Sequence, residues 1–267
     1  MLVMAALQAR PRGRAVIPYI EQPHLVVGPF RWSAYWLLVC TAALVGHLLI
    51  LRRAEKTGLE PSIAGWLSLW MILFGFAGSF LFKFSYRPEY LLNILASVRR
   101  PPGIASFGGI FGGLLAGLLY LKWRYPKRAE KLRYMDAVAW AFPSAWIFGR
   151  AGCALAHDHP GIRTSSWLGV QYPGGTRYDL GLLEVLFLAP VVVLFFWLGR
   201  RPRPPGFFLG LFLILYGLFR LALDTLHVAP VRYFGWTVDQ FASAAAMLAG
   251  ALSLLHARQG RTNAQET

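Results

Sequence analysis

The sequence predicts an all-α polytopic membrane protein of about seven transmembrane helices, with the N-terminus outside and the C-terminus inside the cell. Of the 267 residues, 56% are hydrophobic and only 15% are charged, which is more apolar than a typical soluble domain. The apolar residues fall in blocks of about twenty, the length that crosses ~30 Å of hydrocarbon. The net charge of +15 lies in short segments between these blocks. Such charges meet anionic headgroups and set topology, so we expect a membrane and no nucleic acid as partner.

The apolar blocks predict where each helix lies. Residues 1–31 carry arginines but lack the pattern of a cleavable signal peptide, so we expect an extracytoplasmic N-terminal segment. The third block is rich in glycine, and small residues let helices approach closely in lipid. Pro143 and Pro190 lie inside the fourth and fifth blocks, where proline can kink a helix. The predicted helices are residues 32–51, 62–84, 103–121, 136–156, 180–198, 205–226 and 235–256, which form a transmembrane domain over 32–256 before a cytoplasmic polar tail, 257–267.

The loop charges predict the orientation of these helices. With the N-terminus outside, the cytoplasmic segments hold fourteen lysines and arginines, against ten arginines in the outer segments. The densest basic segment is 122–133, which then faces the cytoplasm. Because positive charge is enriched on the cytoplasmic side, this arrangement is favoured over its inverse.

On this map, ionisable residues from four helices gather near the outer face. Charged groups at membrane depth cost several kcal/mol unless they are paired or hydrated. The pattern therefore predicts a polar cavity that opens toward the outer leaflet. Tyr35 falls in the first outer turn of the first helix. The ionisable residues at this level are Arg150, Asp158, Asp179, Glu184, Arg220, Asp224 and Asp239.

Two interpretations of these charges remain open. Asp224 follows Arg220 by four residues, so the two side chains could simply neutralise each other on one helical face. Arg150 and Arg220, however, come from different helices. A guanidinium presents a planar fork that suits a phosphate, and phospholipid headgroups lie within reach of an outward-facing cavity.

Five segments, taken in chain order, carry a family resemblance. The first is IPYIEQPHLVVGPFRWSAYW, in which Tyr35 follows a Gly-Pro pair, and the second is SFGGIFGG at 106–113. The others are DAVAWAFPSAWIFGRAGCALAHDHPG at 136–161, YGLFRLALD at 216–224 and GWTVDQFAS at 235–243. Together they resemble the bacterial prolipoprotein diacylglyceryl transferases over nearly the whole chain.

The resemblance implies a transferase of lipoprotein biosynthesis in the bacterial inner membrane, multi-pass, with its active site toward the periplasmic leaflet. It would move a diacylglyceryl group from phosphatidylglycerol to the lipobox cysteine thiol in a preprolipoprotein signal peptide. The products would be a thioether and glycerol-1-phosphate. Arg150 and Arg220 would hold the phosphate as its charge changes. This chemistry requires no cofactor.

The sequence also departs from the family pattern. Phe107 stands where the family has a histidine, and Cys153 and Ala156 stand where it has asparagines. Asp158 and Asp224 are shorter versions of its acidic residues. The residues that would bind a headgroup are thus better retained than those that would transfer a proton. This leaves an alternative, a catalytically altered or inactive phospholipid-binding accessory membrane protein of the same fold. A small transporter is disfavoured because transporters place polar groups near the midplane.

His157 and His159 flank Asp158 at the outer end of the fourth helix. We hypothesise that one of them replaces the missing histidine, with Asp158 orienting it, since an imidazole titrates near neutral pH. A solvated surface loop is the competing interpretation. The His-Asp-His pattern could also share a metal ion, but zinc would need further ligands, so we expect no metal. Cys153 is expected to be a buried small residue rather than a nucleophile.

Two sets of candidate site residues follow from these arguments. The candidate catalytic residues are Arg150, Arg220, Asp158, Asp224, Tyr35, His157 and His159. The candidate substrate-binding residues are Arg150, Arg220, Ser106, Phe107, Gly108, Gly109, Gly161, Glu184 and Asp239.

Overall fold

The computed structural model describes residues 17–86, 105–125, 128–229 and 232–263, and these residues form a helical bundle. The prediction of an all-α polytopic membrane protein is confirmed. Within the described ranges, six helices are long and apolar enough to cross a membrane, and α6 is the remaining long helix. The helices are α1 (Ala34–Lys56), α2 (Pro61–Tyr86), α5 (Ser106–Arg124), α6 (Arg128–Ala156), α7 (Leu180–Leu198), α8 (Phe207–Asp224) and α9 (Val238–Asn263).

Each predicted helix has its counterpart, but the ends differ where charged or strand residues were misjudged. α1 continues five residues beyond the predicted end at residue 51, to Lys56. α9 continues through much of the predicted polar tail, to Asn263. A helix satisfies its backbone hydrogen bonds internally, so it can extend past its apolar block into polar surroundings. Predicted residues 103–104 and the arginines at 10, 12, 14, 87, 99 and 100 lie outside the described residues.

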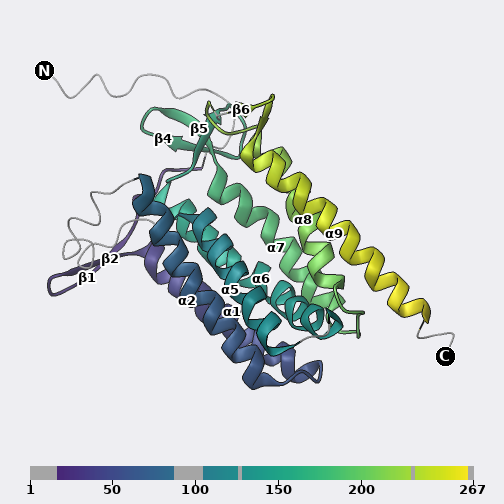
Figure 1. The fold of residues 1–267 in the computed structure, drawn as a ribbon. Helices are drawn as coiled ribbons and strands as arrows, with labels where there is room; N and C mark the ends of the chain where they lie inside the picture. The colour runs from purple at the N-terminus through teal and green to yellow at the C-terminus, as the bar shows by residue number, and fades with distance from the viewer. Residues whose placement is uncertain (1–16, 87–104, 126–127, 230–231, 264–267) are drawn as a thin grey trace, which may run out of the picture.

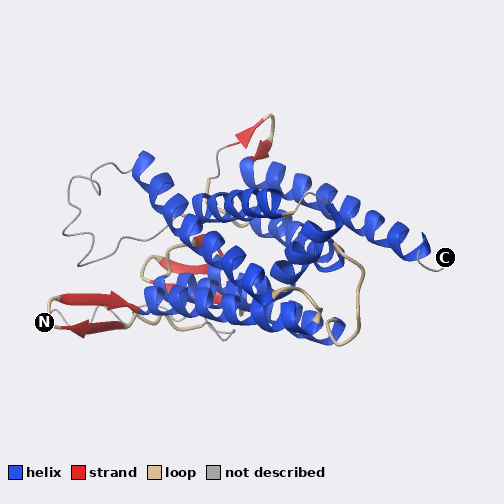
Figure 2. Ribbon diagram, turned by 60° about the horizontal axis from the view of Figure 1, so that its bottom comes forward, coloured by secondary structure: helices blue, strands red, loops and turns tan. Residues whose placement is uncertain are grey.

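Three small antiparallel sheets join the helices. Figure 1 shows the strands toward the end of the helices at which α1 begins, while the last turns of α9 lie at the opposite end. Figure 2 shows the first hairpin projecting from the bundle. The sheets are β1 (His24–Val27) with β2 (Phe30–Ser33), then β3 (Pro160–Arg163), β4 (Gly169–Tyr172) and β5 (Gly175–Asp179) in the order β3-β5-β4, and β6 (Arg232–Tyr233) with β7 (Trp236–Thr237).

Helices α2 and α5 pack through glycines. A Cβ atom built on Gly108 would collide with the carbonyl oxygen of Gly78, and one built on Gly78 would collide with Gly108 in turn. A Cβ on Gly109 would lie 2.5 Å from the Ser79 hydroxyl oxygen. The glycines therefore allow the close backbone approach that the composition predicts.

A buried cluster ties α1, α6, α7 and α8 together at the end opposite the strands. Arg53 of α1 is buried and donates from Nη1 to the carbonyl oxygen of Gly199, 2.9 Å away, after α7. Its guanidinium lies 5.0 Å from the ring centroids of Trp140 and Phe208. Asp136 of α6 accepts a 2.9 Å hydrogen bond from the Leu209 N–H in the first turn of α8. This cluster fixes the four helices whose other ends carry the polar residues described next.

Candidate functional site

A buried carboxylate, Glu184, lies between the two arginines that the sequence singles out. Glu184 is in the first turns of α7, and its side chain is 1% exposed. Arg150 of α6 places Nε 2.9 Å from Glu184 Oε1. Arg220 of α8 places Nη1 3.8 Å from the other oxygen, Oε2. The structure thus brings the two arginines to one shared carboxylate.

Arg220 also extends the cluster to a fourth helix. Its Nη2 donates to Asp239 Oδ2 over 2.5 Å, and Asp239 lies in the first turn of α9. Two guanidinium groups therefore face two carboxylates, so the formal charges of these four side chains cancel. Cancellation matters because a buried charge without a partner costs several kcal/mol. We call Arg150, Glu184, Arg220 and Asp239 the charge cluster.

Two aromatic side chains complete the surroundings of Glu184. Trp146 Nε1 donates to Glu184 Oε1 over 2.9 Å, and the Tyr216 hydroxyl donates to the same oxygen over 2.5 Å. Sequence reasoning missed both residues. A usable signal existed, because Trp146 and Tyr216 each precede an arginine of the cluster by four residues and so share its helical face.

The Arg150 guanidinium contacts several neighbouring side chains but keeps N–H groups that could donate to a ligand. Its Nε is buried and lies close to Glu184, but the angle of this contact is outside hydrogen-bond geometry. We regard the pair as an ion pair rather than a hydrogen bond, because charge attraction tolerates poor angles better than hydrogen bonding does. Its carbon Cζ lies 4.8 Å from the Trp146 ring centroid, and Nη1 lies 3.9 Å from Cys153 Sγ. A guanidinium has five N–H groups, so this geometry leaves donors for a ligand.

Asp224 does not neutralise Arg220, which was one of the two interpretations left open. Asp224 is buried, and its Oδ2 accepts a 2.8 Å hydrogen bond from the Thr237 hydroxyl. Its Oδ1 lies 3.6 Å from His227 Nδ1. Thr237 in turn exchanges 3.1 Å hydrogen bonds with Gln240 in the first turn of α9. Asp224 therefore ties the end of α8 to the segment at the start of α9.

The two histidines beside Asp158 lie in different surroundings. His157 places Nδ1 2.8 Å from Asp179 Oδ2, and Nε2 3.1 Å from the Ile20 carbonyl oxygen. Because a carbonyl can only accept, Nε2 carries a proton and donates. The ring also stacks on Tyr19, with centroids 4.1 Å apart. His157 therefore fastens the segment before β1 to the β3-β5-β4 sheet.

Asp179, the partner of His157, also contacts α7 and β4. It caps α7 by accepting from the Leu182 N–H over 3.0 Å, and it accepts from the Tyr172 hydroxyl over 2.9 Å. Burial and the adjacent carboxylate raise the pKa of Tyr172 above its usual range, so the phenol keeps its proton and donates. Ile17 adds a backbone bridge to Val170 of β4. We call His157, Asp179, Tyr172 and Ile20 the N-terminal clasp.

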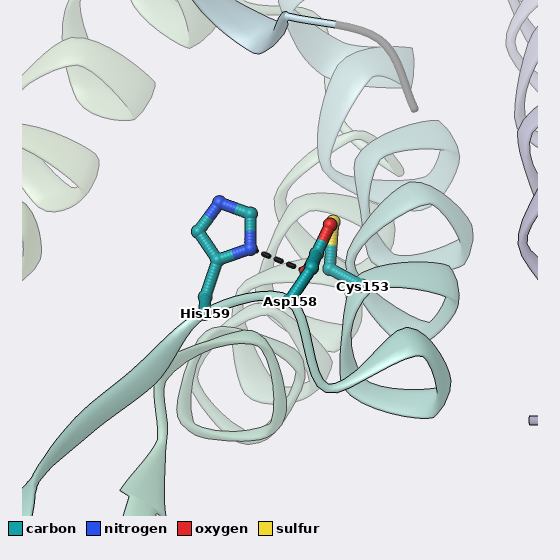
Figure 3. Close-up of side chains that lie close together, drawn as sticks. All are labelled: Cys153, Asp158 and His159. Atoms are coloured by element: carbon teal, nitrogen blue, oxygen red, sulfur yellow. Dashed lines mark hydrogen bonds and ion pairs between the residues drawn. The ribbon is translucent and has the colours of Figure 1, made fainter. Parts of the chain in front are cut away.

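His159 turns toward Asp158 instead. Its Nδ1 makes a short contact with Asp158 Oδ1, and the two side chains are 38% and 43% exposed. Figure 3 shows that Cys153, from the last turns of α6, lies beside this pair. The thiol, carboxylate and imidazole ligand atoms all lie within 4.8 Å of one another. Sequence reasoning paired the two histidines and left Cys153 out, because it could not know that His157 turns to the N-terminal clasp.

The remaining candidates lie at helix and strand contacts. Tyr35 is buried and packs on α6, where a Cβ on Gly152 would lie 3.1 Å from its ring. Ser106 begins α5, the Phe107 side chain is exposed, and Gly108 and Gly109 face α2. A Cβ on Gly161 would lie 2.9 Å from the Leu226 carbonyl oxygen, so this glycine allows β3 to approach the segment after α8. The contacts of these glycines are thus packing contacts.

Comparison with known proteins gives a consistent result. Residues 23–256 match the sequence profile of the family described as prolipoprotein diacylglyceryl transferase. Proteins named phosphatidylglycerol–prolipoprotein diacylglyceryl transferase are similar over most of their length. The protein from Pasteurella multocida is 30% identical, with 93% of this chain and 96% of the relative covered. Those from Nitratidesulfovibrio vulgaris (strain Miyazaki F) and Leifsonia xyli are 30% and 28% identical, covering 82% and 89% of this chain and 86% and 78% of the relatives.

Proposed function

The chain belongs to the prolipoprotein diacylglyceryl transferase family, and from this premise we propose that it transfers a diacylglyceryl group from phosphatidylglycerol to the lipobox cysteine thiol of preprolipoproteins. The match covers most of the chain and includes every residue of the charge cluster. Relatives that match over most of both sequences carry the enzyme's name, which favours the enzyme over an inactive accessory protein.

The observation that carries the proposal is that Arg150 and Arg220 share one buried carboxylate. Glu184 holds two guanidinium groups from different helices within reach of one another. A phosphodiester headgroup carries one negative charge, and its leaving phosphomonoester gains a second as the carbon–oxygen bond breaks. Fixed cations stabilise this growing charge more than they stabilise the bound substrate, which is the condition for catalysis. We assign phosphate binding to both arginines, and their orientation to Glu184 and Asp239.

The acceptor thiol must also lose a proton, since the thiolate is the nucleophile. Both ring nitrogens of His157 already have partners within the N-terminal clasp, so this imidazole is not placed to accept a proton from the substrate. His159 is partly exposed, contacts Asp158 and lies near Cys153, which neighbours Arg150. We therefore assign proton removal to His159, with Asp158 as its orienting partner. Phe107 leaves no titratable group at the position where the family has a histidine.

We further propose that the strand-bearing end of the bundle faces the periplasmic leaflet. The opposite end carries the basic turns after α1 and α5 and the basic segment between α7 and α8. Positive charge is enriched on cytoplasmic loops, so this end belongs in the cytoplasm. The charge cluster then lies at the level of the outer headgroups, where phosphatidylglycerol is available.

The test is complementation in cells depleted of their own transferase, together with an assay of the purified chain. A lipobox peptide and phosphatidylglycerol vesicles would be incubated with the protein, and the peptide mass would report the added diacylglyceryl group. We expect rescue and a mass shift with the wild type, and loss of both with Arg150→Ala. Arg163→Ala is the matched control, because Arg163 is an exposed arginine at the same end, outside the charge cluster. A well-folded wild type with neither activity would overturn the proposal in favour of a phospholipid-binding accessory protein.

A further inference from the structure

Cys153, Asp158 and His159 bring together three different ligand types at the edge of the candidate site (Figure 3). Cys153 is buried in α6, whereas Asp158 and His159 lie on the segment that follows this helix and are partly exposed. Their ligand atoms lie within 4.8 Å of one another. A thiolate, an imidazole and a carboxylate are the three side-chain ligands that Zn²⁺ accepts in proteins.

We propose that these three residues bind a divalent metal ion of the zinc class, and that the fourth coordination position takes the acceptor thiol. The second half of this inference rests on the proposed function, whereas metal binding itself does not. Catalytic zinc sites likewise have three protein ligands, drawn from these side-chain types, and one position left for water or substrate. The exposed side of Asp158 and His159 provides the approach to that position.

The distances allow such a site after a small adjustment. Bonds of ~2.0–2.3 Å in a tetrahedron place neighbouring ligand atoms roughly 3.4–3.6 Å apart. A pair of ligand atoms at the observed limit of 4.8 Å must close by about 1 Å, and the short contact between Asp158 Oδ1 and His159 Nδ1 must open for both atoms to bind one ion. Asp158 and His159 can supply both movements by side-chain rotation, because both are partly exposed. Cys153 stays where α6 holds it, so the buried thiol sets the position of the ion.

The charges around the cluster also favour a divalent cation. Deprotonated Cys153 and ionised Asp158 together carry two negative charges, which a divalent ion neutralises. Arg150 Nη1 lies 3.9 Å from the sulfur and stabilises the thiolate. The positive charge of Arg150 is itself balanced by Glu184, whose Oε1 lies 2.9 Å from Nε. Because Glu184 balances the charge of Arg150, the guanidinium repels a bound metal ion less.

An imidazole that binds the ion cannot also accept the thiol proton. When the metal is bound, His159 therefore acts as a ligand, and coordination of the acceptor thiol replaces the imidazole as the cause of its deprotonation. A thiol that binds such an ion loses its proton, which passes to solvent. The sulfur then forms a bond to the glycerol carbon of phosphatidylglycerol, and the bond from that carbon to the phosphate oxygen breaks. The oxygen keeps the electron pair and leaves as glycerol-1-phosphate, so no oxidant or reductant is needed. Because Arg150 contacts Cys153, the nucleophile and the phosphate-binding guanidinium would be neighbours.

The metal can be tested directly with Co²⁺, which reports a bound thiolate through a charge-transfer absorption. The full chain in detergent would be stripped with a chelator and titrated with cobalt chloride. Since the sequence has only two cysteines, Cys40 and Cys153, the variant Cys40→Ser is the matched control. We expect the absorption at one equivalent in the wild type and in Cys40→Ser, and its loss in Cys153→Ser.

The other ligands and the role in transfer need separate measurements. Asp158→Asn and His159→Ala should each weaken cobalt binding at least about tenfold, since even outer-shell partners are worth 10–100-fold in metal affinity. Chelation should lower the rate of peptide modification, and added zinc should restore it. Cobalt absorption that persists in Cys153→Ser would overturn the metal site. Equal rates of peptide modification before and after zinc addition would overturn the role of the metal in transfer. A chain that binds cobalt through Cys153 but modifies no peptide under any condition would overturn the proposed function and leave the metal site standing.

Discussion

Nε of Arg150 lies 2.9 Å from Oε1 of Glu184, and this ion pair is the centre of the polar structure in the bundle. Glu184 also accepts from Trp146 and Tyr216 and faces Arg220 from its other oxygen. A single carboxylate thus sets the positions of groups from α6 and α8. This arrangement predicts how substitutions in the charge cluster change stability and transfer.

Removing the charge of Glu184 should destabilise the protein and stop transfer. Glu184→Gln leaves Arg150 and Arg220 without their shared carboxylate, and breaking a buried ion pair costs about 3–5 kcal/mol. Thermal unfolding in detergent and the peptide assay would measure both effects. Glu55→Gln is the control, because Glu55 is exposed near the C-terminal end of α1, at the end of the bundle away from the charge cluster. Equal unfolding temperatures for the two variants would contradict the central place of Glu184.

Lysine should not replace either arginine in binding the phosphate. Arg150→Lys and Arg220→Lys keep the charge but lose the planar fork that binds a phosphate through two donors. We expect each substitution to lower the rate of transfer by about 10²–10³, the range for loss of one transition-state donor. Insertion and folding should remain close to wild type, as measured by gel filtration in detergent. Transfer at the wild-type rate in both lysine variants would remove the fork geometry from the mechanism.

His157 and His159 should separate stability from activity. His157→Ala leaves Asp179 and the Ile20 carbonyl without their partner, which should lower the free energy of unfolding by about 1–3 kcal/mol. His159→Ala should leave stability nearly unchanged and abolish most of the transfer. His256→Ala, an exposed histidine on α9, should change neither property. A His157 variant with wild-type stability would mean that the N-terminal clasp contributes little to folding.

Two glycines of similar helical setting should respond oppositely to one methyl group. A Cβ on Gly108 meets the backbone of Gly78, so Gly108→Ala should destabilise by about 1–3 kcal/mol through overpacking. Gly149→Ala is the matched control, because a Cβ there meets nothing within 4 Å. This second change should be neutral or stabilising by up to about 1 kcal/mol. Similar unfolding temperatures would show that α2 and α5 can separate without cost.

The proposed orientation can be measured with a membrane-impermeant thiol reagent. In a background of Cys40→Ser and Cys153→Ser, Phe234→Cys would mark the strand-bearing end and Arg201→Cys the opposite end. Phe234 is fully exposed between β6 and β7, so its replacement should react freely. We expect labelling of residue 234 from the periplasm, and of residue 201 only after the membrane is opened. The reverse pattern would place the charge cluster at the cytoplasmic face.

The sequence predicted the helices well, because a span is set by the thickness of hydrocarbon and by the apolar residues that fill it. It predicted the sheets poorly. β3, β4 and β5 are short. β4 pairs with β5 across a turn that ends at Gly175, whose φ of +111° favours glycine, whereas β3 pairs with the other edge of β5. Their positions depend on contacts such as that between Ile17 and Val170, which join distant parts of the chain.

For the candidate site, chain order alone placed Arg150, Glu184, Arg220 and Asp239 at one end of the bundle. Helices that alternate in direction bring every second terminus to the same face, so residues near those termini share a level. Only the tertiary structure decided which groups meet. Arg220 lies beside Asp239 of α9 and not Asp224 of its own helix, and His159 rather than His157 lies beside Cys153. The first choice depends on how α8 and α9 are rotated about their axes, which is fixed by packing against neighbouring helices rather than by local sequence. The second depends on the backbone of the segment after α6, where His157 has a φ of +51°.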